Sequence, residues 1–194
     1  MEFMLWMPVF LFFLGFILAG NDAFQRRYAT LAATETVADV LSRQYGMNEA
    51  ALDELDRLQQ ALLPGVGDPR LLRLTSLRCR KPSTASGGVD ETSACVVEAT
   101  WSCAVGTGAT NGMRFAAGQD IGALLPVDLP PLRHQEEILL VELSVPFTAI
   151  SQLAGLDVDG WYVPLLVKPR YVSRLRIEAG VAGCNAVPGG GSEV

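Results

Sequence analysis

The sequence predicts an α+β fold, in which an N-terminal transmembrane helix continues into a long helix packed on an antiparallel β-sheet of four or five strands. Three changes of pattern predict it. Residues 1–20 are almost entirely apolar, residues 21–64 repeat apolar positions at helical spacing, and residues 65–178 alternate apolar and polar positions as strands do. Residues 179–194 are rich in glycine, so we expect a flexible tail there. The chain therefore divides into an anchor, two helices, a β domain and a tail.

The anchor is the longest uncharged segment of the chain. Eighteen residues from Phe3 to Gly20 carry no charge, and as a helix they span about 27 Å, close to the ~30 Å hydrocarbon core of a bilayer. A cleaved signal peptide is the less favoured alternative, because no basic residue precedes the run and because the run exceeds the usual ~7–15 residues. Asn21 also stands where a lipoprotein would need a cysteine. A buried core helix of a soluble protein is the weakest alternative, since this segment is polar on no face.

The composition narrows the classes of function. The formal net charge is −6 and the pI is about 4.8, so the chain has no basic stripe for nucleic acid. His134 is the only histidine and no C-x-x-C motif is present, so we expect no metal site and no cofactor. Four cysteines follow the anchor, which favours an oxidising compartment and two disulfides. Four buried free thiols are the alternative.

The helical region is predicted to contain two helices. The first continues from the anchor through Asp22 to Tyr45, giving a rod of about forty residues, roughly 60 Å long, that stops at Gly46. Asn48 is expected to cap the second helix, Glu49 to Leu63. Its buried stripe is predicted to consist of Leu52, Leu55, Leu58 and Leu62.

The β domain is predicted from alternating residues. Strands are expected at Arg70–Arg80, Cys95–Cys103, Ile138–Phe147, Trp161–Val167 and Arg170–Ile177. The second strand should place Cys95, Val97, Ala99, Trp101 and Cys103 on one face. The third should place Leu139, Val141, Leu143, Val145 and Phe147 inward, and Leu140, Glu142 and Ser144 outward.

No catalytic constellation is visible, so we predict that the protein is not an enzyme. His134 lies in a polar segment before a strand, and no G-x-S-x-G motif is present. Glu136 and Glu137 are adjacent, so in a strand they would point to opposite faces and could not act as an acid–base pair. The sequence from Asp157 to Gly160 lacks the full spacing of a calcium loop, and Val105 to Gly108 lacks the lysine of a phosphate loop. We therefore expect no small-molecule substrate.

The cysteine order favours one pairing. Cys79 ends one predicted strand and Cys95 begins the next, so a hairpin would place the two cysteines beside each other on neighbouring strands. Cys103 would then pair with Cys184 in the tail, although four cysteines allow three connectivities.

The N-terminus resembles that of a known family. Residues 1–8 read MEFMLWMP, a glutamate–phenylalanine pair followed by an apolar run with an early proline. This opening resembles the TadE/TadG-like proteins of tight-adherence (Flp, type IVc) pili. Residues 22–26, 38–44 and 138–147 are also similar to members of that family.

The resemblance implies a minor pilin or pseudopilin. Such a protein would be a single-pass protein of the inner membrane with its domain in the periplasm, and it could be incorporated in a surface pilus. Its partners would be other pilins and the proteins of the pilus assembly platform. The resemblance makes Glu2, Phe3 and Pro8 the candidate assembly contacts, with Glu2 pairing with the N-terminal amine of a neighbour. The alternative is that Glu2 simply favours the start of a helix through the helix dipole.

Two features leave alternatives open. The basic leader of the family is not present in this sequence, so translation could start upstream, the numbering could begin near the mature end, or the protein could be unprocessed. Arg26 and Arg27 follow the anchor, and the positive-inside rule would then place the domain in the cytoplasm. Two rival functions are a membrane-anchored periplasmic adaptor without a pilus role and a membrane-tethered hydrolase that uses His134.

Overall fold

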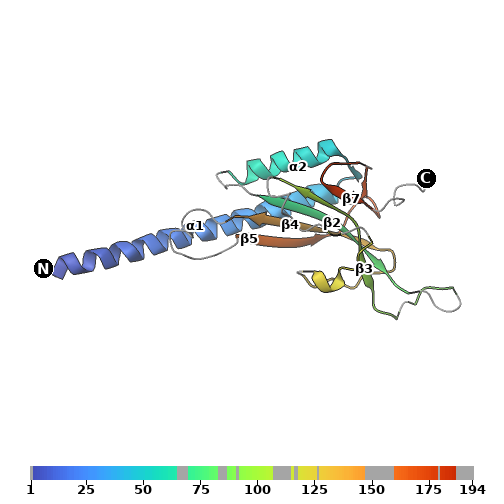
Figure 1. Cartoon of the computed structure of the whole chain (residues 1–194), viewed down its shortest axis with the longest axis horizontal. Helices are drawn as coiled ribbons and strands as arrows, with labels where there is room; N and C mark the ends of the chain where they lie inside the picture. Colours follow the sequence, from blue (N-terminus) through green and yellow to red (C-terminus); the bar gives the residue numbers. More distant parts are fainter. Residues whose placement is uncertain are drawn as a thin grey trace.

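The computed structural model describes residues 2–64, 70–82, 87–90, 92–106, 115, 118–125, 127–146, 160–178 and 180–186. One helix, α1 (Glu2–Ser42), contains 41 residues, with Pro8 inside it. Figure 1 shows its N-terminal half extending alone from the rest of the molecule, while its C-terminal half runs beside the sheet. The prediction of one continuous helical rod is thus confirmed, although the helix ends three residues before Tyr45.

The second helix, α2 (Glu49–Leu62), begins where the sequence predicted it. The side chain of Asn48 accepts a hydrogen bond from the backbone N–H of Ala51 at 2.9 Å, which satisfies one free donor of the first turn. The buried stripe differs in part from the prediction. Leu52, Leu55 and Gln59 are buried, whereas Leu58 and Leu62 are only partly buried.

The main sheet has five antiparallel strands, as predicted. They are β2 (Leu71–Arg80), β3 (Val96–Val105), β4 (Glu137–Val145), β5 (Trp161–Val167) and β7 (Cys184–Ala186), in the order β5-β4-β2-β3-β7. A short 3₁₀-helix, η1 (Gly122–Leu124), follows a segment bonded to β3. The α+β class is therefore confirmed.

The prediction that Arg170–Ile177 forms a strand of this sheet is wrong. Only β6 (Arg176–Ile177) is extended and paired, and it pairs in parallel with β1 (Gly46–Met47) in a separate two-stranded sheet. The chain leaves the main sheet after Pro169, and the backbone N–H of Arg170 donates to the carbonyl of Ser42 at 2.8 Å. The fifth strand is instead β7, from a segment that we expected to be a mobile tail. Residues 187–194 of that tail lie outside the described residues.

The prediction that alternate residues from Cys95 to Cys103 share one face of the second strand, β3, is also wrong. Its pairing with β2 shifts between Ser76 and Leu77, so that Trp101 lies opposite Ser76 while Ala99 lies opposite Leu77. Thr100 is therefore one extra residue, a β-bulge that reverses the phase of the alternation. As a result Val97 and Ala99 pack on one face of the sheet, and Trp101 and Cys103 pack in the cluster of the other face.

Two clusters of apolar side chains cover the two faces of the sheet. The first joins α1, α2 and the sheet, and its members include Val37, Leu41, Leu55, Leu74, Trp101, Val141 and Leu143. The second consists of Leu77, Val97, Ala99, Phe115, Ile121, Ile138 and Leu140. Because both faces are covered, Leu140 and Glu142 are buried rather than facing outward as predicted, and only Ser144 of that set is partly exposed. Phe147, predicted to be inward, lies outside the described residues.

Two contacts fix the direction of β5 relative to α1. The guanidinium of Arg27 lies 5.5 Å from the ring centroid of Trp161, at the start of β5, and Ser42 is bonded to Arg170, just after its end. The strand therefore runs parallel to α1. We call the end of the sheet at Trp161, from which the helix projects, the near end.

Candidate functional site

The projecting part of α1 is the most unusual surface of the molecule. Its large apolar side chains from Trp6 to Leu18 are all exposed, from 41% for Leu14 to 72% for Phe12. Among the described residues this is the one helix that is long and apolar enough to cross a membrane, and a signal sequence would pass the same test. Exposed apolar patches of this extent are rare on soluble monomers and are typical of surfaces that contact a membrane or another protein.

The three candidate assembly contacts lie on this helix. Glu2 and Phe3 form its first turn and Pro8 lies inside it, with an exposed side chain. The side chains of residues 1–5 lie outside the described ones, so the roles of Glu2 and Phe3 stay predictions.

Polar and aromatic residues begin just beyond the projecting segment. Arg26 forms an ion pair with Asp22 one helical turn earlier, at 2.8 Å. Phe24 and Tyr28 lie one turn apart on α1 and are 59% and 69% exposed. The helix thus changes from uniformly apolar to mixed character at the level where the sheet begins.

Two disulfides fasten the β domain. Cys79 is bonded to Cys95, with Cα atoms 5.5 Å apart, and Cys103 is bonded to Cys184, with Cα atoms 4.1 Å apart. This is the pairing that the strand order favoured, and it leaves no free thiol. The first bridge links β2 to the start of β3, and the second joins residues that lie opposite each other in β3 and β7. Disulfides are compatible with a periplasmic or extracellular location.

His134 contacts the backbone of Lys81 and the side chain of Gln135. Its Nδ1 atom accepts a hydrogen bond from the backbone N–H of Lys81 at 3.1 Å, and its Nε2 atom lies 3.4 Å from Nε2 of Gln135. Within the described part of the chain, no three His, Cys, Asp or Glu side chains are grouped as metal ligands would be. The sequences at 107–108 and 157–159, considered above as phosphate and calcium loops, lie outside the described residues.

The adjacent Glu136 and Glu137 have opposite electrostatic environments. Glu136 accepts a hydrogen bond from the backbone N–H of Arg133 and another from Lys168, which lower its pKa. Glu137 is only 5% exposed, and burial raises its pKa despite the nearby charges of Arg174, 3.8 Å away, and Arg78. The two adjacent carboxyl groups therefore differ in how readily each one holds a proton.

This contrast predicts a pH dependence of stability. Between the ordinary pKa of 4.5 and the raised pKa of folded Glu137, the folded state holds a proton that the unfolded chain has released, so this group destabilises the fold as pH rises. As the pH rises above 4.5, the free energy of unfolding of Glu137→Gln should therefore increase relative to that of the wild type. Glu136→Gln is the matched control with the opposite sign, because the lowered pKa of Glu136 contributes stability that is present above 4.5 and lost as pH falls. Urea unfolding in detergent micelles at several pH values would give the free energy of unfolding of each variant relative to the wild type. If this difference changed with pH in the same direction for both variants, the opposite pKa shifts of Glu136 and Glu137 would be contradicted.

The sequence analysis missed a buried polar network on the face of the sheet opposite α1. Arg73 of β2 donates two hydrogen bonds to the carboxylate of Glu142, its neighbour on β4, and the hydroxyl of Tyr162 donates to the same carboxylate. Burial alone would lower the pKa of Arg73, but its bonds to Glu142 and the charge of that group outweigh the effect and raise it. The pKa of Tyr162 is also raised, by burial and then by its bond to Glu142. The apolar run before Glu142 was a sign that both faces of this strand are buried.

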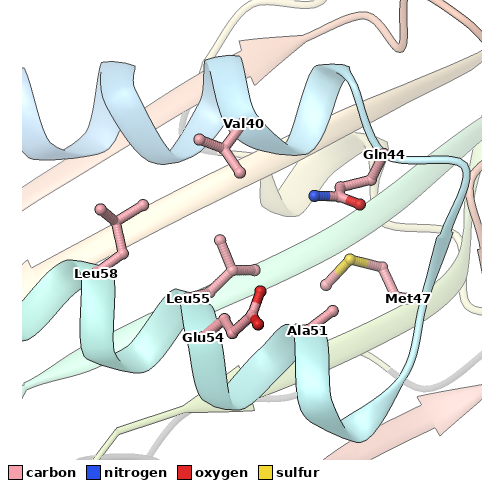
Figure 2. A pocket seen from close by; sticks show the side chains of 7 residues that line it. All are labelled: Val40, Gln44, Met47, Ala51, Glu54, Leu55 and Leu58. Atoms are coloured by element: carbon pink, nitrogen blue, oxygen red, sulfur yellow. The ribbon is translucent and has the colours of Figure 1, made fainter.

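A groove separates α1 from α2. Val40 of α1 and Gln44, two residues after the end of α1, line one side. Ala51, Glu54, Leu55 and Leu58 of α2 line the other, with Met47 at the end where the chain turns (Figure 2). Its volume is about 200 Å³ and Glu54 is its one titratable lining residue. The groove therefore offers apolar contact but no acid–base pair or nucleophile.

Comparisons with protein-family models, with curated proteins and with solved structures gave no match to this chain.

Proposed function

We propose that this protein is a minor pilin-like subunit that takes part in the assembly of a tight-adherence pilus. Residues 1–20 anchor it in the inner membrane, and its folded domain lies in the periplasm. The observation that carries the proposal is α1, a single helix that exposes large apolar side chains from Trp6 to Leu18 while its second half contributes to the core of the domain. The two disulfides support the periplasmic location.

This arrangement suits a subunit that is first held in lipid and later packed among other helices. The exposed half of α1 is covered by acyl chains in the membrane and by helices of neighbouring subunits in an assembly. The docked half is held on the sheet by the first core cluster, which includes Val37 and Leu41 from α1 and Val141 and Leu143 from β4. Glu2, at the start of the helix, would need a cationic partner near the membrane, because an unpaired charge is costly there.

A pair of matched variants tests the anchor. Leu11 lies near the middle of the projecting segment and Leu124 lies on η1, and their exposed fractions are similar, 53% and 58%. An arginine at the centre of a transmembrane helix costs about 2.5–3.5 kcal/mol. Leu11→Arg should therefore release the protein from the membrane fraction, whereas Leu124→Arg should not. Equal retention of both variants would contradict the anchor.

A deletion strain tests the pilus role. Loss of the protein should reduce the number of sheared surface fibres, and the wild-type chain should restore them while Leu11→Arg should not. Unchanged fibres in the deletion strain would overturn the pilus role. A protein that stays in the membrane and never purifies with pilus components would instead be a periplasmic adaptor. A reporter fused after Val194 that is active only in the cytosol would overturn the periplasmic location and favour the orientation that Arg26 and Arg27 suggest.

A further inference from the structure

The near end of the sheet lies very close to the end of the apolar segment of α1. The uncharged run ends at Gly20, and with a rise of about 1.5 Å per residue Phe24 lies about 6 Å and Arg27 about 10 Å further along the helix. The headgroup layer on each side of a bilayer is about 5–7 Å thick, the difference between its full thickness and its hydrocarbon core. Phe24 therefore lies within the headgroup layer and Arg27 just beyond it.

Side-chain direction brings these groups closer still to the lipid. In an α-helix the Cα–Cβ bonds tilt toward the N-terminus, which for α1 is the anchored end. The guanidinium of Arg27 and the rings of Phe24 and Tyr28 therefore reach back toward the headgroups. The ring of Trp161, 5.5 Å from the guanidinium of Arg27, lies at the same level.

The residues at this level have the chemistry of a membrane interface. Tryptophan and tyrosine are enriched where a protein meets the headgroups, since each has an apolar ring and a polar group, and arginine can reach phosphate with its long side chain. Phe24 and Tyr28 are exposed here, and Trp161 is partly exposed. No flexible linker separates anchor and domain, because α1 is helical throughout from Glu2 to Ser42.

We propose that the surface formed at the near end by Arg27, Trp161, Phe24 and Tyr28 is a docking surface for the lipid headgroups of the membrane that holds α1. The partner is the phosphate-bearing surface of the bilayer itself. This proposal rests on the anchoring part of the proposed function, but it requires neither a pilus nor a particular orientation of the protein.

Tryptophan fluorescence in vesicles tests the proposal. The chain has three tryptophans, Trp6, Trp101 and Trp161. A full-length variant with Trp6→Phe and Trp101→Phe keeps Trp161 alone, and it would be reconstituted in vesicles of phosphatidylcholine and phosphatidylglycerol with a nitroxide either on the headgroup or at the bilayer centre. We expect the headgroup label to quench Trp161 several-fold more strongly than the central label.

Two control variants separate the possible failures. With all three tryptophans replaced by phenylalanine, Phe12→Trp places one reporter at the middle of the anchor, which the central label should quench. A variant with Trp6→Phe and Trp161→Phe keeps only Trp101, which is 4% exposed and which neither label should quench. If position 12 is quenched and Trp161 is not, the docking surface is overturned and the anchor stands. If position 12 is not quenched by the central label, the anchor and the docking surface both fail.

Discussion

Arg73→Met is expected to lower the free energy of unfolding by about 3–5 kcal/mol, because it leaves a buried carboxylate without its cation. The side chain of Glu142 is 2% exposed and that of Arg73 is 11% exposed. The hydroxyl of Tyr162 would remain as a hydrogen-bond donor to Glu142, but it carries no positive charge. Arg73 also lies over the ring of Phe115, with its guanidinium carbon 4.8 Å from the centroid, and methionine would keep most of that apolar contact.

The double variant Arg73→Met/Glu142→Leu should recover much of this loss. Replacing both members of a buried ion pair by apolar residues of similar volume is often neutral or stabilising, because neither charge then has to be removed from water. The freed hydroxyl of Tyr162 can bond to water, since the residue is 47% exposed. Urea titrations of the wild type, both single variants and the double variant would complete the cycle.

An exposed ion pair on the same sheet is the matched control. Arg80 and Glu98 lie 3.2 Å apart across β2 and β3, and their side chains are 67% and 17% exposed. Arg80→Met should cost no more than about 1 kcal/mol, as for other surface pairs. Equal losses for Arg73→Met and Arg80→Met, or a double variant as unstable as Arg73→Met, would contradict the argument from burial.

Removal of the disulfide Cys103–Cys184 is the second change with a large expected effect. In the chain-entropy description a cross-link with a sequence separation of 81 stabilises the folded state by about 4.5 kcal/mol, against about 3 kcal/mol for the separation of 16 between Cys79 and Cys95. Cys103→Ala/Cys184→Ala should therefore destabilise the protein more than Cys79→Ala/Cys95→Ala. β7 has only three residues and pairs with β3 at the edge of the sheet.

Two measurements would check this order. Urea titrations in micelles would give the two losses, and hydrogen exchange would show whether the amides of β7 lose protection only in the Cys103/Cys184 variant. A larger loss from the shorter loop would show that native contacts, rather than restriction of the unfolded chain, determine the effect.

The sequence predicted the elements that are specified by local pattern. The helices were found because their apolar spacing persists over many residues and because Asn48 and Gly46 mark the boundary between them. The disulfide pairing followed from the order of two adjacent strands. The uncharged N-terminal run likewise identified the surface on which the functional proposal rests.

The remaining features depend on contacts between distant residues. The bulge at Thr100 inserts a single residue, and nothing local to β3 distinguishes it from regular alternation. Residues 170–177 had the composition of a strand, but Arg170 bonds to α1, and the indole of Trp101 donates to the carbonyl of Leu175 at 2.8 Å. The apolar run before Glu142 indicates that both faces of β4 are buried, but the partner of this buried carboxylate, Arg73, could not be inferred without the register of β2 and β4.

The unbroken course of α1 has a mechanical consequence. A pull or a twist applied to its free end would pass along a hydrogen-bonded rod directly into the first core cluster, with no slack chain to absorb it. The load would be carried by side chains such as Val37 and Leu41, by the Arg27–Trp161 contact and by the bond between Ser42 and Arg170. The projecting part of α1 and the folded domain should therefore move as one rigid body, so that a displacement or rotation of the helix about its axis moves the domain by the same amount.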